Sequence, residues 1–138
     1  MRTKSFILLG LLTFLIFGNG MAQTPNSKNY KITLNKIPGS GGGPDITKII
    51  SGKVEGKDVS SLLIVIYAKA GGKWWVQPTT DNPFTKINTS GLWQNETHLG
   101  IQYGVLLVNK SFKPQNTYTT LPQTDNSVVS VIVVDAAK

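Results

Sequence analysis

Short runs that alternate apolar with polar residues, or are apolar throughout, follow one another from residue 30 onward. No stretch of a dozen residues in this part shows a helical period, so the pattern predicts strands. Residues 30–34 alternate and predict a half-buried strand, whereas 61–68 and 128–134 are apolar at nearly every position and predict core strands buried on both faces. Further strands are expected at 46–54, 73–77, 84–88, 92–93 and 101–108.

Turn-forming residues separate these runs. Gly71-Gly72 predicts a hairpin turn into the strand that Pro78 ends, and residues 88–91 have turn chemistry. Seven or eight short strands divided in this way predict an all-β fold, an antiparallel β-sandwich of the immunoglobulin-like or transthyretin-like kind. We expect a single domain, with an N-terminal strand and Gly-rich loop at 23–45 and the sandwich core at 46–138.

The first 22 residues have the composition of a signal peptide. Arg2 and Lys4 precede an almost wholly apolar run at 6–17, and Gly20-Met21-Ala22 offers small residues at a cleavage site before Gln23. The apolar run is about 12 residues long, shorter than the ~20 that cross a bilayer, so a retained anchor is the weaker interpretation. The prediction is a secreted or periplasmic protein with no stable membrane span after signal cleavage.

The amino-acid composition limits the metal sites, cross-links and partners that this chain can have. The 138 residues include no cysteine and one histidine, which excludes disulfides and thiolate metal sites and leaves little for a His-built centre. We therefore expect no metal and no cofactor. Without the signal peptide the chain has 12 basic and 7 acidic residues, a net charge of +5, and no arginine. The lysines are dispersed, and specific nucleic-acid binding relies strongly on arginine, so we expect no nucleic-acid partner.

Aromatic residues concentrate between residues 73 and 103, where all three tryptophans lie. Trp74 and Trp75 are adjacent, so an extended backbone directs them to opposite faces, and one ring is expected outside the main core. An exposed ring beside amides and hydroxyls suits stacking on a sugar; the alternative is that loops cover both faces and the aromatics are structural. The ligand-binding candidates are Trp74, Trp75, Gln77, Phe84, Thr85, Trp93, Asn95, His98 and Tyr103.

Catalytic patterns are weak in this chain. Ser90, Asp81 and Glu96 lie near His98 in the sequence, but a triad requires them to meet in space and GxSxG is absent. Residues 97–100 are more simply interpreted as a turn before the next strand. A pair of carboxylates across a cleft, as glycosidases need, is not expected in a sandwich of this size. We predict a protein without catalytic residues.

A set of short motifs resembles a β-sandwich module of exported bacterial proteins. The motifs are Tyr67-Ala68, Trp74-Trp75-Val76-Gln77-Pro78, Pro83-Phe84-Thr85, Gly91-Leu92-Trp93, Thr97-His98-Leu99-Gly100 and Leu106-Leu107-Val108. The resemblance covers about residues 47–134, with Gly104 where the pattern has alanine. It implies an accessory module that accompanies carbohydrate-active or cell-surface proteins. Residues 50–56 also resemble transthyretin-like or carboxypeptidase-regulatory sandwiches, a competing assignment for the same architecture.

Together these observations predict a secreted, non-catalytic β-sandwich that serves as a glycan-binding or accessory module. The alternative is a protein–protein interaction or cell-surface structural module, and a small hydrolase is the weakest interpretation. The expected partner is accordingly a glycan or another exported protein.

Overall fold

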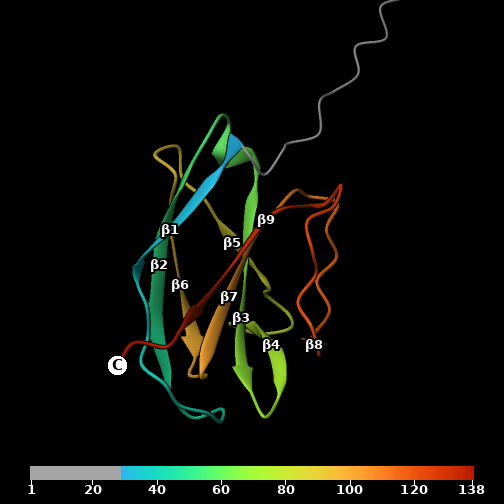
Figure 1. Cartoon of the computed structure of the whole chain (residues 1–138). Helices are drawn as coiled ribbons and strands as arrows, with labels where there is room; N and C mark the ends of the chain where they lie inside the picture. Colours follow the sequence, from blue (N-terminus) through green and yellow to red (C-terminus); the bar gives the residue numbers. More distant parts are fainter. Residues whose placement is uncertain (1–28) are drawn as a thin grey trace, which may run out of the picture.

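The computed structural model describes residues 29–138 (Figure 1). This part of the chain is all β, with nine strands and one short 3-10 turn, Val59–Ser61. The all-β antiparallel prediction is confirmed, with slightly more strands than the seven or eight expected. The predicted signal peptide at 1–22 lies outside the described residues.

The strands form two sheets in which every pairing is antiparallel. The smaller sheet has the order β1-β2-β6, with β1 at Lys31–Lys36, β2 at Thr47–Glu55 and β6 at Leu92–His98. The larger sheet has the order β8-β4-β3-β7-β9, and β5 pairs with β3 alongside β4. Its strands are β3 Leu63–Ala70, β4 Lys73–Gln77, β5 Phe84–Lys86, β7 Gln102–Val108, β8 Thr117–Tyr118 and β9 Val128–Asp135.

The β3–β4 hairpin has the two-glycine turn that the sequence predicts. Gly71 and Gly72 both have positive φ, which matches the twist that a two-residue hairpin turn needs. The turn sets the register, so Ala70 lies opposite Lys73 and Ala68 lies opposite Trp75. The hairpin therefore places a small side chain of β3 directly beside the second indole of β4.

The central core lies between the two sheets. It contains the inward-facing residues of β2, β3 and β7, including Ile50, Ile64, Ile66 and Val105, all fully buried. Each such side chain contributes roughly 1.5–3 kcal/mol when it leaves water, so these strands supply much of the stability of a domain without disulfides.

A second core covers the opposite face of the larger sheet. Residues 109–127 cross this face between β7 and β9, and Phe112 and Leu121 from this segment pack on Val65, Tyr67 and other outward-facing residues. The remaining members are Trp74, Val76, Leu106, Val108 and Val128. Both faces of β3 and β7 are consequently buried, as their unbroken apolar sequence predicts.

The final strand departs from the prediction. Val128 and Val129 are buried, but Val131 is only partly buried and Val133 is 47% exposed. The interpretation of residues 128–134 as buried throughout is therefore wrong. The second half of β9 is partly exposed because β9 is the last strand of its sheet and the segment 109–127 covers only its first half.

Strand β6 also differs from expectation, since it continues through Gln94–His98, where a turn was expected to begin at residue 97. This polar stretch is a strand because it pairs along its length with β2, from Lys53 opposite Leu92 to Thr47 opposite His98. Gln94 and Glu96 are exposed and need no apolar character, whereas Thr97 is buried. The two-residue strand β8, held against Trp74 and Trp75, had no signal in the sequence.

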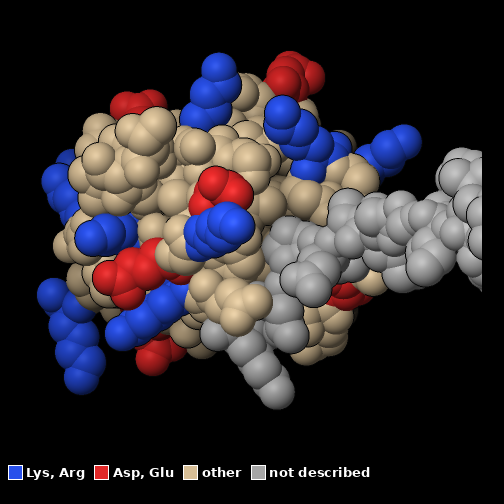
Figure 2. All heavy atoms as spheres, turned by 90° about the horizontal axis from the view of Figure 1, so that it is seen from above, with Lys and Arg blue, Asp and Glu red and all other residues tan. Residues whose placement is uncertain are grey.

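Surface charge is mixed. On the face seen from above, lysines and acidic residues are interspersed (Figure 2). No helix among residues 29–138 has the length and apolar composition that a membrane crossing requires.

Candidate functional site

The two adjacent tryptophans lie in different environments. Trp74 is buried in the second core, where the Lys69 Nζ stands 5.3 Å from the centre of its ring. Trp75 faces the other side of β4 and is 48% exposed. The prediction that one indole lies outside the protein interior is confirmed, and that indole is Trp75.

The exposure of Trp75 follows from where β6 ends. Gln77 and Trp75 point to the same side of β4, and Gln77 meets the last residue of β6, His98. Trp75 is two residues nearer the hairpin turn, beyond the end of β6, so no strand lies above it. Its Nε1 donates a hydrogen bond of 3.0 Å to the Ala70 carbonyl oxygen, which fixes the indole against β3.

A groove of about 610 Å³ opens beside this ring. We call it the Trp75 groove. Apolar residues form most of its wall, namely Pro44, Ala68, Ala70, Pro78 and Leu99. Its polar side chains are Gln77, Thr79, Thr80 and His98. The methyl side chains of the two alanines leave the space that larger residues of β3 would fill. None of the described residues that line the groove is acidic, lysine or arginine.

Gln77 joins β4 to the end of β6. Its Oε1 accepts hydrogen bonds from the His98 main-chain N–H at 2.8 Å and lies 2.9 Å from His98 Nδ1. Its Nε2 donates to the Trp75 carbonyl oxygen at 3.2 Å. Gln77 is buried, and these contacts use both ends of its amide. It therefore links Trp75 to His98, and its oxygen and one of its two Nε2 hydrogens are already used within the protein.

The same contacts indicate which ring nitrogen of His98 carries a hydrogen. An amide oxygen can only accept hydrogen bonds, so the Nδ1 atom facing Gln77 Oε1 carries a hydrogen. In the neutral imidazole, Nε2 is then an acceptor. His98, which lines the groove, thus keeps one acceptor nitrogen that Gln77 does not use.

Several other candidates are core residues. Tyr103 is fully buried; its hydroxyl donates to the Gly39 carbonyl oxygen at 2.9 Å and accepts from the Gly100 N–H at 3.1 Å. Burial raises the pKa of this phenol, and the Gly100 contact partly opposes the rise. Phe84 is half-buried and packs on the second core. These rings, like Trp74, stabilise the fold and do not face the Trp75 groove.

Thr85 and Asn95 form a separate contact. The Asn95 Nδ2 donates to the Thr85 Oγ1 at 2.9 Å, and Thr85 is buried. The Asn95 Oδ1 accepts from the main-chain N–H of Glu96. The pair fastens β5 to β6, and neither residue borders the groove.

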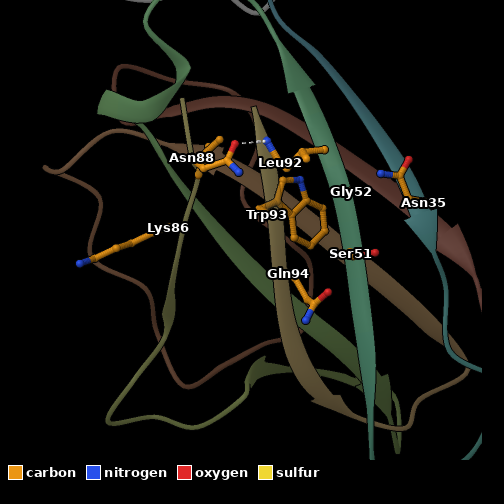
Figure 3. A pocket seen from close by; sticks show the side chains of 9 residues that line it. Asn35, Ser51, Gly52, Lys86, Asn88, Leu92, Trp93 and Gln94 are labelled. Carbon is orange, nitrogen blue, oxygen red and sulfur yellow. Dashed lines mark hydrogen bonds between the residues drawn. The ribbon is translucent and has the colours of Figure 1, made fainter. Parts of the chain in front are cut away.

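Trp93 lies beneath a second, shallower hollow of about 570 Å³ (Figure 3). It is only 3% exposed, and its ring lies beside Gly52, where a Cβ would come within 2.6 Å of it. Lys86 and Asn35 border the hollow but project away from the indole on opposite sides. The Trp93 Nε1 is sealed from solvent and has no hydrogen-bond partner among the described residues. This hollow therefore presents no accessible indole to a ligand.

Of the nine candidates, the structure brings together Trp75, Gln77 and His98. The described residues contain no group of three His, Asp or Glu side chains close enough to hold a metal ion. The partner of His98 Nδ1 is an amide rather than the carboxylate of a triad. What the site can offer is one aromatic face, an apolar wall and a few neutral polar atoms.

Neither the protein-family models nor the curated proteins nor the solved structures give a match for this chain. The function must therefore be argued from the groove itself.

Sequence reasoning missed the apolar wall of the groove, namely Ala68, Ala70, Pro78 and Leu99. A signal for two of them was present. Once the Gly71-Gly72 turn is placed, the hairpin register sets Ala68 opposite Trp75 and Ala70 one pair nearer the turn. Leu99 and Pro44 reach the groove from other parts of the fold and had no local signal.

Proposed function

We propose that this protein is an exported, non-catalytic β-sandwich that binds a neutral saccharide in the Trp75 groove. The observation that carries the proposal is the half-exposed indole of Trp75 beside a concave wall. The resemblance to accessory modules of exported bacterial proteins agrees with this proposal.

The fixed indole favours a stacked ligand. Because Nε1 is already bonded to Ala70, Trp75 can offer a ligand its π face but not its N–H. The C–H groups on one side of a pyranose ring match such a face, since they are weakly polar and the face carries partial negative charge. The ring is also held before the ligand arrives, so little side-chain entropy is lost on binding.

The polar atoms of the groove suit neutral hydroxyl groups. Thr79 and Thr80 each have a hydroxyl that donates and accepts, and His98 adds the acceptor Nε2. Because no charged side chain lines the groove, it offers no ionic partner for an acidic sugar, a phosphate or a cationic ligand. A neutral hexose or pentose polymer is the saccharide class that fits.

A second candidate is recognition of another exported protein. The wall is mostly apolar, and an apolar side chain of a partner could fill the space over Ala68 and Ala70. The saccharide proposal is the better match because the groove is concave and its one large aromatic is held rigidly. The two candidates predict different results when the purified protein is applied to insoluble polysaccharides: only the saccharide proposal predicts that the protein is retained.

The test is retention of the purified protein on insoluble cellulose, chitin, xylan and mannan. We expect retention on at least one of them, and Trp75→Ala should weaken it about tenfold or more, as loss of a central aromatic contact does. The matched control is Leu92→Ala, because Leu92 is 45% exposed but lies outside the groove. Its retention should equal that of the wild type.

Two results would overturn the saccharide proposal. One is no retention on any of the four polymers, which would leave the protein-recognition candidate. The other is retention that Trp75→Ala does not weaken, which would place the saccharide elsewhere on the surface. Circular dichroism of each variant confirms that the fold is unchanged.

A further inference from the structure

The Trp75 groove is more apolar than an unmodified sugar requires. It combines the exposed face of the Trp75 indole with a wall of aliphatic side chains, namely Pro44, Ala68, Ala70, Pro78 and Leu99. A stacked hexose matches only the indole, because its ring C–H groups cover the aromatic face while its hydroxyl groups lie around the rim of the ring. The aliphatic wall favours a ligand that also carries an apolar group at its rim.

The hairpin register places part of this wall directly beside the indole. Ala68 is the cross-strand partner of Trp75, and Ala70, two residues along β3, has its side chain on the same face of the sheet. The Trp75 Nε1 bonds to the Ala70 carbonyl oxygen, which keeps the ring close to this residue. Both alanines line the groove. A substituent at the rim of a sugar stacked on Trp75 can therefore reach their methyl groups.

A hydroxyl group is poorly matched to this position. The alanine methyl groups neither donate nor accept hydrogen bonds, and a polar group that leaves water without gaining a partner is destabilised. Polar side chains in the lining are few, and Gln77 is largely used by its contacts with Trp75 and His98. A substituent that ends in a methyl group avoids this cost, since apolar surface on both sides leaves water.

We propose that the saccharide of the Trp75 groove is an N-acetylated hexosamine, stacked on Trp75 with the methyl group of its 2-acetamido substituent over Ala68 and Ala70. This inference rests on the proposed saccharide function and names the class of sugar. The acetamido group is neutral, in keeping with a lining in which no described residue is acidic, lysine or arginine. A free amino group at the same carbon is partly protonated near neutral pH and would enter without an acidic partner.

The amide of the acetamido group also has partners in the groove. Its N–H only donates, and the ring nitrogen of His98 that Gln77 does not use is an acceptor. Its carbonyl oxygen needs a donor. The Thr79 Oγ1 accepts from the Asn82 main-chain N–H at 3.2 Å, which leaves the hydroxyl hydrogen for a ligand. An unmodified sugar could use these same polar atoms, so the selection comes from the alanine methyl groups.

Three soluble tetrasaccharides with the same linkage and ring configuration test this inference. The tetramers of chitin, cellulose and chitosan differ only at carbon 2, which carries an acetamido, a hydroxyl and an amino group respectively. Titration calorimetry should give the chitin tetramer a dissociation constant about tenfold or more below that of the cellulose tetramer, because a methyl group is buried and no hydroxyl loses its partner. The chitosan tetramer should also bind more weakly than the chitin tetramer.

A variant tests where the methyl group lies. Ala70 is partly buried, and Ala70→Val fills the assigned space while keeping the wall aliphatic. The preference for the chitin tetramer over the cellulose tetramer should fall to about threefold or less. This preference is a ratio within one variant, so it does not depend on how much of the protein is folded. The matched control is Thr33→Val, which is exposed on β1 outside the groove and should keep the wild-type preference.

Three results would overturn the inference. They are a chitin tetramer that binds the wild type no more tightly than the cellulose tetramer, an undiminished preference in Ala70→Val, and retention of the protein on cellulose, xylan or mannan but not on chitin. The third result would leave the proposed saccharide function intact. Absence of retention on all four polymers would instead overturn the proposed function, and this inference with it.

Discussion

The side-chain oxygen of Gln77 binds both the main-chain N–H and the ring Nδ1 of His98, and this contact holds β4 to the last residue of β6. It connects the two sheets beside the Trp75 groove, which both residues line. The same glutamine donates to the Trp75 carbonyl oxygen. One buried amide thus sets the positions of the aromatic ring and the acceptor nitrogen that would meet a ligand.

Replacing this amide by an apolar side chain of similar length should weaken the fold as well as the site. Gln77→Met leaves the partly buried His98 N–H without its partner and removes the second hydrogen bond to the Trp75 carbonyl oxygen, and a polar group left unpaired where water cannot reach it costs about 1–3 kcal/mol. Denaturant unfolding measures the loss. Gln94→Met, at an exposed position of β6, should stay within about 0.5 kcal/mol of the wild type. Equal stability of Gln77→Met and the wild type would mean that the amide contact is unimportant.

The segment that covers the second core should contribute strongly to stability. Leu121 is buried against the outer face of the larger sheet, and a Cβ at Gly104 would come within 2.4 Å of its Cδ1. Leu121→Ala should lower the free energy of unfolding by about 2–5 kcal/mol, as large-to-small changes in a core do. Its exposed neighbour gives the control, Thr120→Ala, with an expected change below about 0.5 kcal/mol. Equal free energies of unfolding for the two variants would mean that the segment 109–127 is not packed on the larger sheet as described.

Asp125 should make stability depend on pH. Its Oδ1 accepts from the main-chain N–H groups of Val128 and Ser127 and from the Ser127 hydroxyl, and these contacts hold its pKa below the ordinary value of 3.8. The folded state therefore binds the proton less readily than the unfolded state does. The stabilisation is complete above pH 3.8 and is lost as the pH falls through the lowered pKa.

The comparison with Asp125→Asn isolates this effect. Thermal unfolding at about pH 7 should show the wild type to be more stable, and the difference should shrink toward about pH 2. A difference that stays constant over this range would show that the ionised carboxylate is not its source. The substitution lies in the exposed turn before β9, so it should leave the core unchanged.

The fold could be predicted largely from the sequence because its strands are marked by local patterns. The runs around Ile64 and Val105 are apolar on both faces, and Gly71-Gly72 marks the hairpin. The length of β6 was underestimated because residues 94–98 are polar and only their pairing with β2 makes them a strand. The exposure of Val133 had no local signal, since it depends on which strand ends the sheet.

The site was predictable only in part, for a related reason. Adjacent tryptophans in a strand must point to opposite faces, so one exposed ring could be expected. Whether Trp74 or Trp75 is the exposed ring depends on the segment 109–127, which covers Trp74 from a distant part of the chain. The burial of Trp93 and Tyr103 likewise reflects contacts with Gly52 and Gly39, which no sequence pattern near either aromatic residue indicates.

The most direct test of the account is quenching of tryptophan fluorescence by acrylamide, with and without a soluble form of the polymer that retains the protein. Of the three tryptophans, only Trp75 is exposed, so Trp75→Phe should remove the quenchable part of the emission while Trp74→Phe should not. We predict that the saccharide protects this part of the wild-type emission from the quencher. Unchanged quenching in Trp75→Phe, or no protection by a saccharide that binds, would contradict the claim that this indole is the contact surface.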